Sequence, residues 1–334
     1  MARQRDPPLD PAAPIDPVRL VLSGHEAGYG SRGVPTDLVI GVDVGGTKML
    51  AGLVARDGGI GRMVEVRTPT ADQAALLAAL DALVEGLLAE GAEAIGVGVP
   101  MNLDRRTGVG LGAVNLPLRS LDLAGHLRDR FGVPVGVEND GNAIALAEWR
   151  VGAGRGAKDL VALALGTGVG GGVVIDGRLY RGWAELGHVV VAADGPPCQG
   201  NCHGHGHLEA VASGEAAERA AVALWGEGAD AHRLVEEARG GDEAACAALG
   251  RIGHYLGVAI GSFANVFAPD LVVVGGGFGT AAWELLRGPA DEAARAEALR
   301  PADGGLRIVQ AALGDDAGLV GAGLVGFETL DGLR

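Results

Sequence analysis

One carboxylate stands where an apolar run ends and a helical pattern begins. Asp140 follows the apolar run Val133–Val137 and lies within the polar stretch Glu138–Asn142. In α/β proteins, ligands bind beyond the carboxyl ends of the strands, so a carboxylate placed there can accept a proton from a bound substrate. Asn and Asp are also favoured N-caps of helices, and this structural role fits the same position. The residues alone therefore leave two roles open for Asp140, a reactive carboxylate or a cap.

A second chemical signal is a short segment rich in cysteine and histidine. Residues 198–207 hold two of the three cysteines and three of the eight histidines, namely Cys198, Cys202, His203, His205 and His207. Thiolate and imidazole donors at this density are typical of a tetrahedral Zn²⁺ site. The alternative is a solvated Gly/His-rich loop without a metal.

Three apolar runs end in glycine clusters, at Gly45–Gly46, Gly166–Gly172 and Gly275–Gly279. Glycine lacks a Cβ and tolerates positive φ, so its backbone N–H groups can approach a polyphosphate. The second cluster contains the spacing G-x-G-x-x-G, but β-favouring residues follow it instead of a helix, which excludes a Rossmann site. A single cluster is typical of an ordinary hairpin turn. Three clusters, each after an apolar run, favour a nucleotide cradle.

These residues must be positioned by the elements around them. Residues 38–69 predict three antiparallel strands separated by glycine turns, and residues 71–91 predict an amphipathic helix. Strands and helices then alternate, and residues 160–180 repeat the opening order of strand, glycine turn, strand and polar turn. Residues 208–268 have a largely helical pattern. This alternation in two halves predicts an α/β protein built from two related domains.

Composition excludes several classes of protein. The 334 residues are 48% hydrophobic and carry a net charge of −15, which argues against a nucleic-acid partner bound through phosphate contacts. Backbone N–H groups can still bind a phosphate ligand. The longest uncharged run, Ile252–Pro269, contains His254 and Asn265, so we expect no membrane span and a cytoplasmic protein. Residues 1–36 are Pro-rich and unpatterned, which predicts a disordered tail.

An ordered set of segments resembles the ROK family (repressors, open reading frames and sugar kinases), which has the actin-like ATPase fold. The segments are Asp43–Lys48, Glu138–Ala143, Leu165–Gly172, Glu185–His188, Leu208–Ala210, Gly275–Gly277 and Asp315–Gly318. Together they cover the chain from about residue 37 to its C-terminus. Each segment alone is a weak signal, whereas their ordered combination is highly specific.

The resemblance implies two related actin-like (ribonuclease H-like) α/β domains with a central cleft. We expect residues 37–148 to form a small domain, with a C-terminal helix over residues 318–334 packing back on it. Residues 149–317 are expected to form a large domain that contains the zinc loop at 198–207. The resemblance also implies a homodimer.

The resemblance further implies ATP-dependent phosphorylation of a hexose, with glucose as the expected substrate and Asp140 as the base that accepts the 6-hydroxyl proton. The residues that match the family's sugar contacts are Asn115, Asn139, Glu185, His188 and Glu209. Asp43 matches the residue that orients Mg²⁺. The positions expected to contact ATP are Gly45, Gly46, Thr47, Lys48, Gly166, Thr167, Gly168, Gly276 and Gly277. A solvated hairpin lysine is the alternative for Lys48.

Many members of the family carry a zinc loop preceded by a histidine ligand. The matching ligands are His188, Cys198, Cys202 and His207, and His203 or His205 is an alternative to His207. Four protein ligands leave no position for a reactive water, so the expected role of zinc is structural. A kinase for N-acetylmannosamine, N-acetylglucosamine or fructose, and a sugar-sensing regulator, are the alternative functions. Met101 stands where the family usually has glycine, and it either reshapes the sugar site or points into the core.

Overall fold

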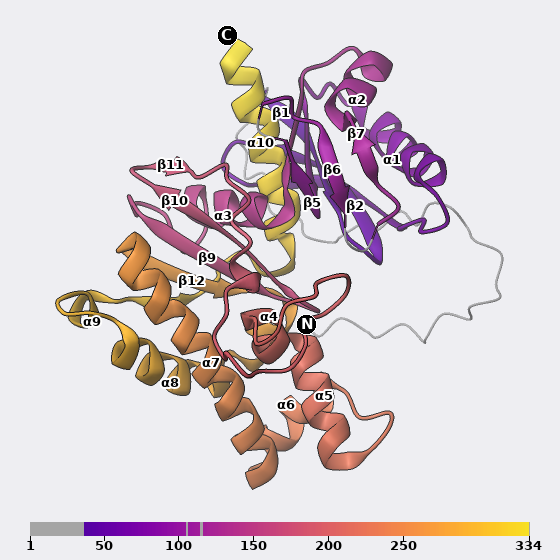
Figure 1. Ribbon diagram of the computed structural model, residues 1–334. Helices are drawn as coiled ribbons and strands as arrows, with labels where there is room; N and C mark the ends of the chain where they lie inside the picture. The colour runs from indigo at the N-terminus through magenta and orange to yellow at the C-terminus, as the bar shows by residue number, and fades with distance from the viewer. Residues whose placement is uncertain (1–36, 105, 114–115, 334) are drawn as a thin grey trace.

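The computed structural model describes residues 37–104, 106–113 and 116–333. The predicted tail over residues 1–36 and the predicted sugar contact Asn115 therefore lie outside the described residues. Two five-stranded sheets and one three-stranded sheet form the β-structure of the described part (Figure 1). The fold class is the α/β class that the sequence predicts.

The first sheet has the strand order β3-β2-β1-β4-β8. Its strands are β1 (Leu38–Val44), β2 (Lys48–Ala55), β3 (Ile60–Arg67), β4 (Ile95–Val99) and β8 (Val135–Asn139). β1, β2 and β3 pair antiparallel, whereas β4 runs parallel to both β1 and β8. The carboxyl ends of β1, β4 and β8 consequently lie at one edge of the sheet.

The second sheet has the order β11-β10-β9-β12-β13. Its strands are β9 (Leu160–Leu165), β10 (Val169–Ile175), β11 (Arg178–Leu179), β12 (Leu271–Gly275) and β13 (Ile308–Gln310). β9, β10 and β11 pair antiparallel, and β9, β12 and β13 pair parallel. Both sheets thus consist of an antiparallel meander extended by two parallel strands. The internal duplication predicted from the two glycine turns is present in the topology.

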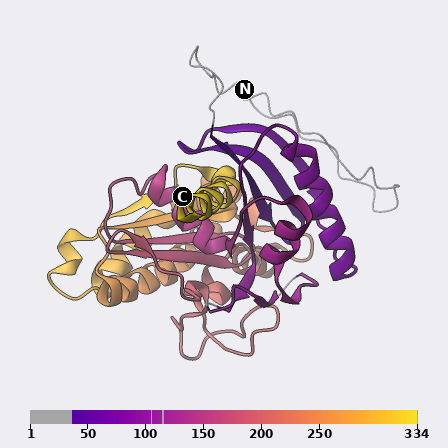
Figure 2. The same ribbon diagram turned by 90° about the horizontal axis from the view of Figure 1, so that it is seen from above.

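Helices cover the sheets in three layers, each with its own buried cluster. α1 (Gln73–Leu88) and α2 (Leu123–Phe131) pack with the first sheet. The helices that share one buried cluster with the second sheet are α4 (Leu208–Ala212), α5 (Gly214–Trp225), α6 (Ala231–Arg239), α7 (Glu243–Phe267) and α8 (Gly277–Glu297). The short α9 (Ala302–Gly305) precedes β13. α3 (Asp140–Arg150) and α10 (Ala317–Leu333) lie between the two sheets and share a cluster with residues of both (Figure 2).

α10 approaches the first sheet closely because glycines face it. A Cβ on Gly41 of β1 would lie 2.5 Å from the carbonyl oxygen of Leu319, and Gly96 of β4 likewise faces the backbone of Ala322. Larger side chains at these positions would push the helix away from the sheet. The chain's last helix therefore packs on its first strands, while the domain boundaries at residues 148 and 317 stay a prediction.

A small third sheet was not predicted from the sequence. It consists of β5 (Met101–Leu103), β6 (Gly110–Ala113) and β7 (Arg119–Leu121). Met101 is 1% exposed and belongs to the cluster under the first sheet, so of its two predicted orientations the side chain takes the one into the core.

Among the described residues one helix, α7, is long and apolar enough to cross a membrane by length and composition. In the fold, 56% of its most apolar window is buried. Its glycines Gly253, Gly257 and Gly261 face the backbone of α8, which is how a core helix of a folded domain packs. Composition alone does not separate these two settings, because a buried helix can be as apolar as a membrane span.

Candidate active site

The structure separates the two roles predicted for Asp140. Asn139, the last residue of β8, is the N-cap of α3, because its Oδ1 accepts hydrogen bonds from the N–H groups of Gly141 at 2.9 Å and Asn142 at 3.3 Å. Asp140 is the first residue inside the helix. Its half-buried carboxylate accepts from the Gly141 N–H at 2.9 Å, and burial raises its pKa above the ordinary value. Asn139 therefore caps the helix. Asp140 follows the end of the strand and has a carboxyl group with a raised pKa.

Asp43 lies near the carboxyl end of β1, close enough to Asp140 for their charges to interact. The pKa of Asp43 is raised to about 6, mainly by burial and also by the charge of Asp140, while the charge of Lys48 lowers it. A Cβ on Gly318, at the start of α10, would lie 2.5 Å from the Asp43 carboxylate, so a larger residue there would displace this side chain. A divalent cation bound between two carboxylates reduces their electrostatic repulsion, and carboxylate oxygens are ligands that suit Mg²⁺.

The two predicted phosphate turns have matching places in the duplicated topology. Gly45–Thr47 joins β1 to β2, and Gly166–Gly168 joins β9 to β10. Apart from its two chain neighbours, no described residue has an atom within 4 Å of a Cβ built on Gly46 or Gly166, so packing does not explain these glycines. Open space above a glycine turn lets a ligand reach the backbone N–H groups.

The other predicted nucleotide residues have more varied surroundings. Gly276 has φ +81°, and a Cβ there would lie 2.6 Å from the Leu165 carbonyl oxygen, so only glycine fits. The carbonyl of Thr167 accepts from the N–H of Glu215 at 3.2 Å, which joins its turn to α5. Lys48 Nζ forms an exposed ion pair with Glu65 at 3.0 Å, the arrangement of a solvated hairpin lysine. A phosphate contact of Lys48 stays a prediction.

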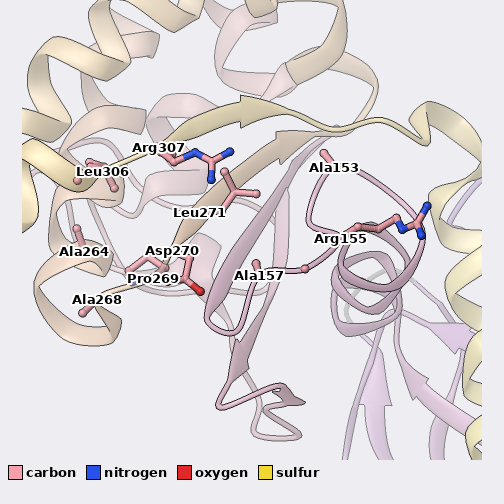
Figure 3. A pocket seen from close by; sticks show the side chains of 12 residues that line it. Ala153, Arg155, Ala157, Ala264, Ala268, Pro269, Asp270, Leu271, Leu306 and Arg307 are labelled. Atoms are coloured by element: carbon pink, nitrogen blue, oxygen red, sulfur yellow. The ribbon is translucent and has the colours of Figure 1, made fainter.

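A cavity of about 160 Å³ lies where the predicted nucleotide residues converge. It is lined by Asp43, by Gly275–Gly277 at the start of α8, and by Gly314, Asp315 and Gly318 at the start of α10. A larger cavity of about 570 Å³ lies at the opposite, amino-terminal ends of β9 and β12, next to Ala157 and Leu271 (Figure 3). None of the predicted site residues lines it, so its size does not make it the candidate active site.

Three of the predicted sugar contacts, Glu185, His188 and Glu209, come from the second half of the chain, and the charge of Asp140 acts on Glu185. Burial raises the pKa of Glu185, the charges of Asp140 and Glu209 raise it further, and His188 lowers it. A hydrogen bond with Asn102 of β5 also lowers it. Asn102 was missed by sequence reasoning, because its role depends on the unpredicted third sheet. Only its place beside Met101 could have drawn attention to it.

Glu209, on α4, is fixed from two sides. Its Oε2 accepts from the N–H of Val169 at 2.9 Å, and a side chain on Gly168 would overlap the carboxylate. Gly168 therefore makes room for Glu209 beside the turn. Gln199, another residue that the sequence did not indicate, donates to the Glu209 carbonyl at 3.0 Å and to Ser213 Oγ at 2.7 Å.

The predicted metal ligands come together in the structure. One donor atom from each of His188, Cys198, Cys202 and His207 lies within 4.8 Å of all the others. The two His Nδ1 atoms are 3.3 Å apart, and the Sγ–Nδ1 distances are 3.7 Å for Cys198–His188 and 3.5 Å for Cys202–His207. Bonds of ~2.0–2.1 Å to nitrogen and ~2.3 Å to sulfur around a tetrahedral Zn²⁺ imply edges of about 3.4 Å and 3.6 Å. Donor types and spacing thus fit Zn²⁺, and the group contains His207 rather than His203 or His205.

Behind Asp140 lies a buried carboxylate that sequence reasoning did not single out. Glu138 Oε1 accepts from Asn142 Nδ2 and from the Asn139 N–H, both at 3.0 Å. Its Oε2 accepts from Arg181 Nε at 3.0 Å, and Arg181 also pairs with Glu328 of α10. Arg181 therefore ties the end of β8 to the second half of the chain and to the last helix.

A duplicated five-stranded fold with two sheets around a carboxylate-lined, glycine-rich cleft defines an actin-like ATPase of the sugar-kinase type. The chain matches the ROK family over residues 39–326 and belongs to that family. The glucokinase of Thermotoga maritima is 37% identical over 320 residues, which cover 90% of this chain and 100% of that enzyme.

Solved structures agree with this placement. The ROK family glucokinase of Streptomyces griseus, solved in complex with glucose and AMPPNP, is 34% identical with a TM-score of 0.75, covering 87% of this chain and 99% of that one. A ROK family transcriptional regulator, a homolog of the E. coli MLC protein, is 25% identical with a TM-score of 0.81, covering 90% and 80%. The predicted family and fold class are confirmed.

Proposed function

We propose that the protein catalyses the phosphorylation of glucose at its 6-hydroxyl by ATP. One observation carries the proposal: the charge of Asp140 acts both on Asp43, at the glycine-rich cleft, and on Glu185, among the predicted sugar contacts. A carboxylate between a phosphate-binding and a hydroxyl-binding group of residues is what transfer of a phosphoryl group to an alcohol requires. Glucokinases 33–37% identical over at least 85% of this chain support glucose as the substrate.

In this mechanism Asp140 accepts the proton of the attacking 6-hydroxyl. Phosphoryl transfer has a loose transition state, so holding the alcohol in line matters more than the strength of the base. Glu185 and Glu209 accept hydrogen bonds from sugar hydroxyls and fix the ring. Mg²⁺ near Asp43, when bound, neutralises charge on the ATP phosphates. The open turns at Gly45–Thr47 and Gly166–Gly168 present backbone N–H groups to those phosphates.

The role proposed for zinc is to fix the sugar side of the site. His188 contributes Nδ1 to the group of four donor atoms, which leaves its Nε2 for a sugar hydroxyl. Metal ligation would therefore set the orientation of a substrate-binding ring. Gln199, next to Cys198, transmits the position of the loop to Glu209. Two further parts of the proposal have other grounds: the homodimer rests on the family resemblance, and the cytoplasmic location rests on the composition of the sequence.

ADP release with Mg²⁺-ATP tests the function on glucose, N-acetylmannosamine, N-acetylglucosamine and fructose. We expect the highest kcat/KM with glucose, and a higher value for another sugar would reassign the substrate within the family. The variant Asp140→Asn should lower kcat by at least ~10³-fold while the Kd for glucose stays within a few-fold. Tight sugar binding by the wild type without turnover on any hexose would instead favour a regulator, the class of the MLC homolog.

A further inference from the structure

A second carboxylate of α3, two helical turns beyond Asp140, is buried without any basic partner among the described residues. Glu148 is 1% exposed and accepts four hydrogen bonds, all from backbone N–H groups. Oε2 accepts from Ala153 at 2.8 Å and from Ala312 at 3.1 Å. Oε1 accepts from Ala312 at 3.1 Å and from Leu313 at 2.9 Å. The Glu148 carboxylate thus accepts the backbone N–H groups of residues 312 and 313, just beyond β13, which a neighbouring strand would otherwise accept.

The segment that Glu148 holds leads directly into the candidate nucleotide cavity. Ala312 and Leu313 are followed by the single 3₁₀ turn Gly314–Asp316 and then by α10. Gly314, Asp315 and Glu148 itself line the 160 Å³ cavity. Before this turn, the last backbone bond to the second sheet is from the Ala311 N–H to the Val274 carbonyl at 2.8 Å. Between that bond and α10, the side-chain hydrogen bonds to this segment come from Glu148 among the described residues, and Leu313 packs against the cluster of the middle layer.

We propose that Glu148 is a positioning residue for nucleotide binding, which acts by holding residues 312–313 and through them the turn at 314–316. This inference rests on the proposed kinase function for its substrate. α3 begins with Asp140, and Glu148 near its C-terminal end holds the cavity wall. The same helix therefore fixes the position of the Asp140 carboxylate relative to the wall of the nucleotide cavity. Loss of the Glu148 anchor should therefore weaken ATP binding selectively and leave glucose binding unchanged.

The isosteric amide cannot replace this carboxylate. Both oxygens accept from N–H groups, so either orientation of a Gln amide would point its NH₂ at a backbone donor. Each such N–H group would lose its hydrogen bond to a carboxylate that is 1% exposed and would face an NH₂ donor instead, which is unfavourable. Glu148→Asp keeps two acceptor oxygens on a shorter side chain and should retain part of the anchor. Glu218→Gln, at an exposed position on α5, is the matched control.

The test combines steady-state kinetics with calorimetric titration of glucose and of a non-hydrolysable ATP analogue. For Glu148→Gln we expect the KM for ATP and the Kd for the analogue to rise about tenfold, with glucose Kd within twofold. Glu148→Asp should give an intermediate rise, and Glu218→Gln none. Equal weakening of both ligands, or unchanged analogue binding, in Glu148→Gln would overturn the inference.

If Glu148→Gln shows no cooperative unfolding transition, Glu148→Asp decides by the same comparison of analogue and glucose affinities. An inactive wild type would reject the proposed function. The analogue titration would still test the positioning role, since it measures binding without turnover.

Discussion

At the residue scale, the main feature of the site is a group of carboxylates close enough for their negative charges to repel one another. Asp43 lies on β1 and Asp140 directly follows β8, the two strands on either side of β4, and each has a pKa raised mainly by burial. Glu185 adds a third raised pKa. Such clusters of perturbed acids are typical of sites that bind cations or move protons. The same electrostatics makes the ligand-free protein less stable than it would be without one of these charges.

Asp43→Asn should therefore stabilise the ligand-free protein in a pH-dependent way. Asp43 has a folded pKa of about 6 against an ordinary value of 3.8, so the folded chain holds the proton more tightly. Wild-type stability then falls as pH rises from about 4 to about 6, while the variant cannot ionise. We expect a gain of about 1–3 kcal/mol at pH 8 and almost none at pH 4, measured by urea unfolding.

Asp129→Asn is the control for this prediction, because Asp129 lies exposed on α2. It should change stability by less than ~0.5 kcal/mol at both pH values. A gain for Asp43→Asn that is equal at pH 4 and pH 8 would contradict an electrostatic origin. Activity of Asp43→Asn should be low, since the charge that destabilises the ligand-free fold is the one proposed to orient Mg²⁺.

At the element scale, the long helix α7 depends on glycines that face α8. A Cβ on Gly253 would lie 2.7 Å from the Leu286 carbonyl oxygen, and one on Gly261 would lie 2.9 Å from that of Ala294. Gly257, between them, meets the backbone of Ala290. The stripe at intervals of four residues brings the two helix backbones together in the core of the second half.

Gly253→Ala should destabilise the protein by about 1–2 kcal/mol, because the methyl group collides with the α8 backbone. Gly250→Ala lies on the same helix, where a Cβ would meet no described atom within 4 Å apart from its chain neighbours and the backbone of its own helix. It should stabilise by about 0.5–1 kcal/mol through helix propensity alone. Urea unfolding of both variants measures the difference. The same sign for both substitutions would show that the close approach of α7 and α8 does not limit packing.

The Cys/His loop is the second element whose role can be tested. Cys202→Ala removes one of four donors, so the protein should lose stoichiometric zinc and its KM for glucose should rise about tenfold through His188 and Glu209. Cys246→Ala, at the exposed third cysteine on α7, should keep both zinc and KM. Elemental analysis of the purified proteins and glucose kinetics measure these outcomes. Full zinc content with an unchanged KM in Cys202→Ala would refute the assignment.

The sequence predicted long, strongly patterned elements and failed where tertiary partners decide. The two strand–glycine turn–strand units and the donors at Cys198 and Cys202 are local patterns, and the structure contains them. The strands β5, β6 and β7 have only three or four residues each, too few for a period-two pattern. Glu148 and Leu313 are 165 positions apart in the sequence, so no local pattern predicts their hydrogen bond.

The sequence also could not show which glycines face a ligand and which allow close packing. Gly166 is open to a ligand, whereas a Cβ on Gly172 would lie 2.7 Å from Ala145 Cβ of α3. The glycine-rich run Gly166–Gly172 thus serves two purposes: its first residues form a turn open to a ligand, and its last residue, on β10, allows close packing of α3. Both purposes require glycine, so the sequence does not distinguish them, whereas the position of α3 in the structure does.

At the scale of the whole molecule, the site is assembled from both halves around a shared middle layer. Asp140 and Asn102 come from the first half, while Glu185, His188 and Glu209 come from the second. Each sheet has its own buried cluster, and α3 and α10 form a third between them. Two separately packed halves joined through one layer can rotate relative to each other with little loss of buried contact.

Glucose should therefore draw the two halves together. A sugar held by Glu185 and Glu209 and facing Asp140 gains contacts from both sides only when the cleft narrows, which also excludes water from the phosphoryl group. We expect the radius of gyration from small-angle X-ray scattering to decrease at saturating glucose, and to stay constant with a hexose that calorimetry shows not to bind. Arg181→Met, which removes the ion pairs from the second half to Glu138 and Glu328, should enlarge the difference between the free and bound states by loosening the ligand-free form. Superimposable profiles with and without bound glucose would mean that the halves are already locked, and that the site is preformed instead of assembled on binding.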